Sequence, residues 1–291
     1  MQVIGHRGAR GRFSENTLEG FRAVAALGIS AFELDVGMTA DGVVVVNHDP
    51  ALHPDLTRDA SNRWISRPGP LIRLLTWAEL ARYDVGRIKP GSPTHRLFPE
   101  QRPHDSARVP TLASVLAALP DAMFVIEVKT DPTHPDWTVE PTVLADAVLS
   151  VVDQTNAATR VVIESFDWRV PSHVRRVRPE IRLAWLTRAR TVAAAALWWD
   201  GVRPSDHDGS VPACVAAAGG FKAGDAWAPD HADLSEALVH EAHALGLSVL
   251  SWTVNRRQDM RRLIGWRVDG LISDRPDVVL EVVREDGCEI V

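Results

Sequence analysis

The stretch LSVLSWTVNRRQDMRRLIGWRVDGLISDRPDVVLEVVRE, residues 247–285, contains the pattern on which the fold depends. Two short apolar runs, at 247–255 and 268–274, are each followed by a segment in which apolar residues recur with helical spacing. Strands that alternate with helices are typical of βαβ units, whose strands run parallel in one sheet. This end of the chain therefore predicts a parallel α/β fold.

The same unit recurs along the rest of the chain. Further apolar runs that precede or approach helical segments are QVIG (2–5), AFELDV (31–36), VVVVNH (43–48), MFVIEVK (123–129), RVVIESF (160–166), RLAWLT (182–187) and GDAWAP (224–229). About eight strand–helix units in a chain of this length predict a closed (β/α)8 TIM barrel. An open doubly wound sheet is the alternative.

Residues 51–108 interrupt this rhythm. They are rich in Pro, Arg, Asp and His and contain one clear helical pattern, at 77–83. We interpret them as an insertion near the start of the barrel, either a lid or a small subdomain. A simple surface excursion is the alternative, because long insertions cost little loop entropy. We expect residues 1–291 to form a single barrel domain that includes this insertion.

Composition and charge exclude several classes of protein. Hydrophobic residues make up 45% of the chain and charged residues 24%, as in ordinary globular proteins. The net charge of −6 disfavours a nucleic-acid partner, because such binding depends on neutralising phosphates. No apolar run approaches the about 20 residues of a membrane span, and no signal peptide is visible. We therefore expect a cytoplasmic protein without a membrane span; its oligomeric state is not predicted.

Acidic side chains lie on two of the predicted barrel strands. Glu33 and Asp35 are two residues apart and so share one face of a strand, as do Glu127 and Lys129. Two carboxylates this close repel each other unless a cation lies between them. A hard divalent cation takes oxygen ligands, so the pattern indicates a metal site with Glu127 as a third ligand. Exposed positions on a half-wet strand face are the alternative.

Histidine ends two of the apolar runs, His6 in QVIGH and His48 in VVVVNH. The unperturbed pKa of imidazole, about 6.5, suits proton transfer near neutral pH. Two histidines at equivalent strand ends, close to carboxylates, favour a general acid–base pair. A hydrogen-bonded core histidine is the alternative for each.

Glycine and arginine are concentrated in GHRGARGRFSENT, residues 5–17. Its GxxGxxG spacing matches neither common nucleotide-binding motif, but it allows a sharp turn after the first strand. Arg7 offers a planar donor group that suits a phosphate. We expect Ser14 or Asn16 to cap the next helix, because Glu19 follows Asn16 at capping-box spacing.

A set of motifs along the chain resembles one known family. In order, the motifs are HRGARGRFSENT (6–17), ELDVGMTADGVVVVNHDP (33–50), EVK (127–129), WTVN (252–255) and DGLISDRPD (269–277). Together they resemble the glycerophosphodiester phosphodiesterase family over nearly the whole chain. The resemblance implies a metal-dependent TIM barrel with an insertion after its second βα unit. It also implies a hydrolase that converts glycerophosphodiesters to glycerol 3-phosphate and an alcohol.

The resemblance also implies roles for individual residues of this sequence. The positions that match the family's acid–base and metal-binding residues are His6 and His48 for proton transfer, and Glu33, Asp35 and Glu127 for one divalent cation, Ca²⁺ or Mg²⁺. The positions that match its substrate-facing and supporting residues are Arg7 and Lys129 at the phosphate, Trp252 at the pocket wall, and Glu15 and Asn16 behind the site. Two departures are Ser14, where proline is usual, and a longer stretch at 50–59.

The implied substrate is thus a small glycerophosphodiester of glycerol and lipid metabolism. One alternative is a lysophospholipase D-type activity, which needs an apolar entry groove. Apolar residues of the insertion that could form it are Trp64, Ile65, Leu71, Ile72, Leu74 and Leu75. These residues could equally form the insertion's own core. The other alternative is a non-catalytic pseudoenzyme that binds phosphodiesters, against which the complete set of histidines and acids argues.

Overall fold

The computed structural model of the protein describes residues 1–66, 69–220, 222, 224–287 and 289–290. Among these residues one sheet of nine strands forms, and all of its strands except β3 run parallel. The parallel strands are β1 (Gln2–His6), β2 (Ala31–Met38), β4 (Met123–Val128), β5 (Val161–Ser165), β6 (Arg182–Thr187), β7 (Ala226–Pro229), β8 (Ser248–Ser251) and β9 (Gly270–Ser273). Because β1 pairs with both β2 and β9, the sheet closes and the predicted (β/α)8 barrel is confirmed.

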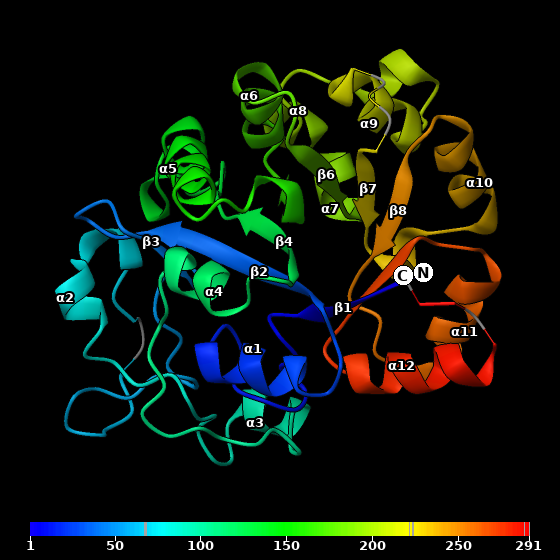
Figure 1. Ribbon diagram of the computed structural model, residues 1–291. Coiled ribbons are helices and arrows are strands. Elements are labelled where there is room, and N and C mark those ends of the chain that lie inside the picture. Colours follow the sequence, from blue (N-terminus) through cyan, green and yellow to red (C-terminus); the bar gives the residue numbers. More distant parts are fainter. Residues whose placement is uncertain (67–68, 221, 223, 288, 291) are drawn as a thin grey trace.

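Helices follow the strands and surround the barrel (Figure 1). They are α1 (Leu18–Ala25), α4 (Leu112–Ala118), α5 (Pro141–Gln154), α6 (Arg169–Val177), α7 (Ala189–Ala193), α8 (Ala195–Trp198), α9 (Val211–Gly219), α10 (Glu236–Ala244), α11 (Arg257–Gly265) and α12 (Pro276–Glu285). Short 3-10 turns are η2 (Pro135–Trp137), η3 (Ala158–Arg160), η4 (Pro204–His207) and η5 (His231–Asp233). No helix in the described part of the chain has the length and apolar character needed to cross a membrane.

The alternation of side chains along the strands divides the apolar core into two layers. On β2, Phe32, Leu34 and Val36 pack between the barrel and its helices. Ala31 instead belongs to an inner layer contributed by all eight barrel strands, namely Ile4, Ala31, Val125, Val162, Ala184, Leu186, Ala226, Ala228, Leu250 and Ile272. Glu33 and Asp35 share the face of Ala31 and lie further along the strand. They therefore lie above this apolar layer, at the carboxyl-terminal end of the barrel, where barrel enzymes carry their active sites.

The run VVVVNH does not form a barrel strand. It contributes β3 (Val44–Val46), which pairs antiparallel with the end of β2, so that Val46 lies opposite Val36. The expectation that His6 and His48 occupy equivalent strand ends was therefore wrong. The antiparallel return still brings His48 towards the barrel mouth, because the chain continues past Val46 alongside Asp35, whose carbonyl accepts from the amide of Asn47 at 2.9 Å.

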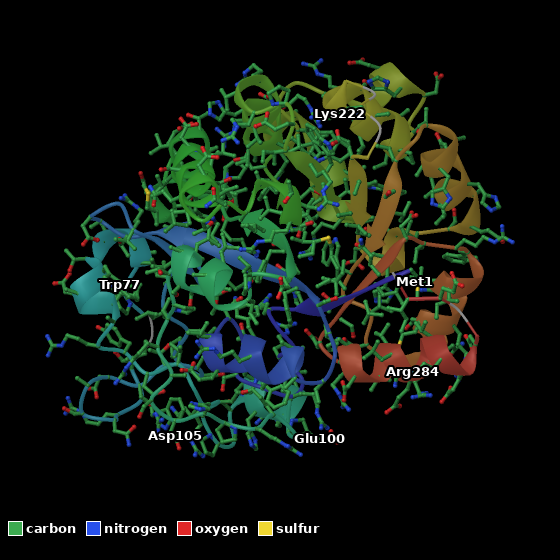
Figure 2. All side chains as sticks on the ribbon, in the orientation of Figure 1. Met1, Trp77, Glu100, Asp105, Lys222 and Arg284 are labelled. Atoms are coloured by element: carbon green, nitrogen blue, oxygen red, sulfur yellow. The ribbon has the colours of Figure 1, made fainter. Side chains whose placement is uncertain are left out.

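The insertion lies inside the second strand–helix unit, between β3 and α4, and not after that unit as expected. It contains η1 (Ile72–Leu74), α2 (Trp77–Leu80) and α3 (Pro93–Leu97). Figure 2 shows its labelled residues Trp77, Glu100 and Asp105 along the outer edge of the molecule. A small apolar core holds it against the barrel and consists of Val45, Leu52, Ile72, Leu80 and Val109. This core favours a small subdomain over a lid, and the single-domain organisation of the chain remains a prediction.

Candidate active site

Carboxylates from three neighbouring strands lie side by side at the barrel mouth. The register places Asp35 of β2 beside Glu127 of β4, and Glu127 beside Glu164 of β5. Glu33 lies beside His6 of β1, and all of these side chains are buried. Carboxylate oxygens of Glu33, Asp35 and Glu127 lie within 4.8 Å of one another. The structure thus brings together the three acids that the sequence predicted as metal ligands.

The electrostatics of this cluster suit a bound cation. Burial, with the charges of Asp35 and Glu164, raises the pKa of Glu33 well above its ordinary value. Burial also raises the pKa of Glu127. Burial acts in the same direction on Asp35, but Lys129 and other nearby positive charges hold the pKa of Asp35 well below its usual range. A hard divalent cation takes such oxygen ligands and would relieve their repulsion, so these residues fit the implied ion.

Two basic side chains adjoin the acids. The ammonium of Lys129 donates to Glu127 Oε2 at 2.7 Å and lies 3.1 Å from Asp35 Oδ1. Arg7 Nη1 donates to Glu15 Oε1 at 2.9 Å, and Arg7 Nε lies 3.3 Å from Asp35 Oδ2. Lys129 and Arg7 therefore approach the acid cluster from both sides of Asp35, and Glu15 orients the arginine, in agreement with the supporting position expected for it.

A tight turn after β1 positions Arg7. A Cβ atom on Gly5 would lie 1.9 Å from the carbonyl oxygen of Gly8, so only glycine fits there. Arg7 itself has φ of +52°, in the left-handed region. This conformation lets the Arg7 amide donate to Glu33 Oε2 at 3.0 Å. The glycine-rich opening stretch is thus a structural part of the site.

The helix cap that follows differs from the expectation. The side chain of Thr17, and not that of Ser14 or Asn16, accepts from the Gly20 amide at the start of α1. Asn16 Nδ2 instead donates to Asp35 Oδ2 at 3.0 Å, and Ser14 Oγ donates to the insertion through the Gly86 carbonyl. The expected cap residues were wrong because both side chains make tertiary contacts.

His6 is held by a carboxylate from the last barrel strand. Its Nδ1 lies 2.6 Å from Asp274 Oδ1, which also accepts from Arg10 Nε at 2.8 Å. Asn255 Nδ2 donates to the other oxygen of Asp274 at 2.7 Å. Burial opposes the charge on Asp274, but His6 and Arg10 hold its pKa well below its ordinary value. A charged Asp274 accepts a hydrogen bond from Nδ1–H of His6. This leaves His6 Nε2 to face Glu33, 3.7 Å away.

His48 has a similar arrangement. Its Nδ1 lies 2.6 Å from Asp49 Oδ1. Burial, together with the positive charges of Lys129 and Arg7, lowers the pKa of His48 to about 4. Burial likewise lowers the pKa of His6, and Asp274 offsets this only in part. Both histidines are therefore neutral near pH 7, and each is fixed through Nδ1 by a carboxylate.

Replacing Asp274 by asparagine is expected to lower the pKa of His6 further, because a nearby carboxylate favours the charged imidazolium. The measurement is an NMR titration of the His6 ring. Asp49→Asn is the matched control: it removes the same charge from the other histidine and is expected to leave the pKa of His6 in place. An unchanged pKa of His6 in the Asp274 variant would contradict this arrangement.

These groups surround a cavity of about 270 Å³ at the barrel mouth. The residues predicted from the sequence that line it are His6, Arg7, Glu33, His48, Glu127, Lys129 and Trp252. Asp35, Glu15 and Asn16 lie behind this wall, in contact with Arg7 or with one another. Trp252 Nε1 donates to the Ala228 carbonyl at 2.9 Å, which fixes the ring at the cavity edge.

Several residues of the site were not singled out from the sequence. They are Arg10, Asp49, Glu164, Phe166, Arg188, Asn255 and Asp274. Arg10, Asp49, Asn255 and Asp274 fall inside the quoted motifs. Glu164 occupies the same place in RVVIESF as Glu127 does in MFVIEVK, which was a usable signal.

Positive side chains, two fixed histidines and an acid cluster at the mouth of a (β/α)8 barrel define the class of barrel hydrolases that act on phosphate esters. Within that class, the sequence matches the Glycerophosphoryl diester phosphodiesterase family over residues 6–278. The chain belongs to this family, and it is a phosphodiesterase by class.

Individual relatives agree with this assignment. The chain is 26% identical to a glycerophosphodiester phosphodiesterase of Caldanaerobacter subterraneus subsp. tengcongensis, over 98% of both proteins. It is also 26% identical to a glycerophosphodiester phosphodiesterase of Bacillus subtilis, over 97% of this chain and 86% of that protein.

Solved structures show the same architecture. A crystal structure from Silicibacter pomeroyi, provisionally named a glycerophosphoryl diester phosphodiesterase, has a TM-score of 0.89 and 35% identity over 99% of this chain and 95% of that one. A phosphodiesterase from Oleispira antarctica, solved with the product sn-glycerol-3-phosphate, has a TM-score of 0.69 and 21% identity over 98% of this chain and 97% of that one. The second likeness concerns the fold alone.

Proposed function

We propose that this protein hydrolyses glycerophosphodiesters to glycerol 3-phosphate and an alcohol, with one divalent cation and two histidines. The observation that supports this best is that His6 and His48, each with a carboxylate at Nδ1, line one cavity. Glu33, Glu127 and Lys129 line the same cavity. Membership of the family supports the substrate class. The cytoplasmic location remains a prediction from the sequence.

Glu33, Asp35 and Glu127 would hold the cation, Ca²⁺ or Mg²⁺. When bound, the ion would neutralise charge on the phosphate and favour ionisation of the attacking oxygen. Arg7 supplies a guanidinium for a phosphate oxygen, and Lys129 supplies a compact positive charge. Because the side chains of Arg7 and Lys129 both contact carboxylates, their positions are set before the phosphate binds.

The two histidines move the protons. Each has Nδ1 fixed against a carboxylate, so Nε2 is the atom available for proton transfer. One histidine takes the proton of the attacking oxygen, and the other protonates the departing alcohol. The lowered pKa of both rings suits the base, which must begin neutral. The reacting phosphate group carries a charge close to that of a dianion. This negative charge would favour the imidazolium form, which the histidine that acts as the acid must have.

The nucleophile we propose is the hydroxyl of the substrate next to the phosphate. Attack by this hydroxyl would give a cyclic glycerol phosphate, which water then opens while the histidines exchange roles. An internal hydroxyl has a large effective molarity beside phosphorus. Direct attack by water could use the same residues.

A substrate that lacks only this neighbouring hydroxyl separates the two routes. We expect the 2-deoxy analogue of a glycerophosphodiester to bind and to be cleaved at least about 10³-fold more slowly, given the effective molarity it loses. The measurement is single-turnover cleavage at saturating substrate. Equal rates for the analogue and the parent compound would exclude cyclisation and leave direct attack by water.

A panel assay tests the proposed function as a whole. Purified protein is given glycerophosphodiesters with different alcohols, and lysophospholipids, in calcium, in magnesium or in chelator. We expect glycerol 3-phosphate to be released from the diesters only when a divalent cation is present. Failure to release it with either ion would contradict the proposal.

A second candidate function is the lysophospholipase D-type activity. It is favoured by a groove of about 680 Å³ that begins at Asp49, next to His48. The groove is mostly apolar, with Leu71 from the residues proposed above and with Leu52 and Trp137. Ile72 belongs instead to the small core of the insertion, and Leu74 is 62% exposed. Lysophospholipid turnover in the same panel would identify this groove as an acyl-chain site.

A further inference from the structure

Glu164 differs from the other carboxylates of the cavity. It is 2% exposed, and among the described residues no group hydrogen-bonds its Oε2. Glu127, in contrast, accepts from Lys129, and Glu33 accepts from the Arg7 amide. A buried carboxylate oxygen without a donor is costly, so its hydrogen-bond partner has to be accounted for. Because Glu164 lines the cavity, its missing donor can come from a ligand.

The residues that the structure describes do not supply this donor. The positive charge of Lys129 acts on Glu164 and lowers its pKa, but the Lys129 ammonium already contacts Glu127 and Asp35. Glu164 also stands outside the group of acids whose oxygens lie within 4.8 Å of one another, so the cation site does not require it. A phosphate brings only acceptors and negative charge. Within a bound substrate, a donor for Glu164 can therefore come only from the part beyond the phosphate.

A hydroxyl is the partner that fits. Burial, with the charges of Glu127 and Asp35, raises the pKa of Glu164 well above its ordinary value. A hydroxyl can donate to the charged carboxylate and can accept from the neutral carboxyl group, so it pairs with either form. An ammonium group pairs only with the charged form.

Aromatic rings lie next to this carboxylate. Phe166 follows Glu164 by two residues, and its ring meets that of Trp252 edge to face, with centroids 5.4 Å apart. Both rings line the cavity with Glu164. A pocket that combines apolar ring surface with one buried polar group suits a short carbon chain that carries a hydroxyl.

The order of the strands indicates how the carbon chain of the substrate would lie in the cavity. His6, the Glu33–Asp35 pair, Glu127 and Glu164 come from β1, β2, β4 and β5, which are neighbours in this order. Glu164 is therefore the acid at the end of the row away from His6. A diester whose phosphorus and neighbouring hydroxyl lie at the His6 end would extend its terminal carbon towards Glu164.

We propose that Glu164 binds the terminal hydroxyl of the substrate's glycerol unit, while Phe166 and Trp252 cover its carbons, so that Glu164 selects glycerol over alcohols without that hydroxyl. This inference rests on the proposed function. It assigns Glu164 to specificity and leaves proton transfer to the histidines.

The experiment compares two diesters with the same leaving alcohol, one of glycerol and one of propane-1,2-diol. The second lacks only the terminal hydroxyl and keeps the hydroxyl next to the phosphate. For the unaltered protein we expect kcat/KM to fall by at least about 10²-fold for the second diester, as is usual when a site built for a hydroxyl meets an analogue without it. Glu164→Leu is expected to remove this difference. Glu164→Gln, which can still hydrogen-bond, is expected to keep part of it.

Binding is measured separately by calorimetry, with glycerol 3-phosphate and propane-1,2-diol phosphate as ligands and with Ca²⁺ alone. We expect the unaltered protein to prefer the first ligand and Glu164→Gln to bind Ca²⁺ as before. Equal kcat/KM for the two diesters in the unaltered protein would overturn the inference, whether or not the variants fold. Loss of Ca²⁺ binding in Glu164→Gln would also overturn it, because Glu164 would then be a metal ligand.

Two further outcomes separate the possible errors. If Glu164→Leu loses only a preference for diesters of cationic alcohols, the partner of Glu164 is an ammonium group and the inference is wrong. If the unaltered protein cleaves neither diester with either metal, the proposed function fails. The calorimetric comparison of the two phosphates then still shows directly whether Glu164 distinguishes the hydroxyl.

Discussion

Exhaustive chelation is expected to abolish hydrolysis of glycerophosphodiesters, and added Ca²⁺ or Mg²⁺ is expected to restore it. Glu33→Gln is expected to lower kcat/KM by about 10³-fold or more, since charge stabilisation by a bound ion is worth several kcal/mol in the transition state. The variant should remain folded, because the pKa of Glu33 is already raised by burial and by Asp35, and an amide of the same size removes that repulsion. The measurements are steady-state kinetics and thermal unfolding of the metal-free protein.

Glu180→Gln is the matched control for this prediction. Glu180 makes an ion pair with Arg178 at the surface, where its side chain is 57% exposed. We expect this variant to keep full activity and full dependence on the cation. Undiminished turnover after chelation, or full activity of Glu33→Gln, would show that the acid cluster takes no part in the reaction.

His6→Ala and His48→Ala are each expected to reduce kcat by about 10²–10⁴-fold, the usual contribution of a positioned proton carrier. The physical reason is that each ring is fixed through Nδ1 by its own carboxylate, so that neither histidine can take the place of the other. The double variant should lose less than the product of the two single effects, because the residues act as a unit. Rates are measured at saturating cation, which separates proton transfer from metal binding.

His243→Ala serves as the control for removal of a histidine. His243 lies on α10, away from the cavity, and its Nε2 lies 2.9 Å from Asp269 Oδ2. This variant is expected to turn over substrate at the unaltered rate. If both His6→Ala and His48→Ala also kept that rate with the cation bound, the acid–base roles proposed here would be wrong.

The local pattern of the chain predicted the parts of the site that depend on one strand at a time. Glu33 and Asp35 share a face because side chains alternate with a period of two along any strand. The count of about eight strand–helix units likewise predicted a barrel, since strand–helix alternation is itself a local property.

The local pattern did not predict the features that depend on which strands pair or on which groups compete for one hydrogen bond. VVVVNH is a good strand sequence, but nothing in it states that it pairs antiparallel with β2. Asn16 has capping-box spacing, yet the buried Asp35 carboxylate competes for its amide, and Thr17 caps α1 in its place. In both cases the outcome depends on a contact with another segment, which is β2 for VVVVNH and the Asp35 carboxylate for Asn16.

The sequence by itself determined the repeated strand–helix units, the alternation that groups the acids on one strand face, and the residues whose motifs match the family. Only the tertiary structure decided which groups meet. His6 and Asp274 are 268 residues apart, and they touch because closure of the barrel places β1 beside β9. Glu164 became a candidate only when the structure showed it buried without a donor. The physical reason is that a hydrogen bond or a desolvated charge depends on what surrounds a side chain in space, whereas periodicity reports only its neighbours along the chain.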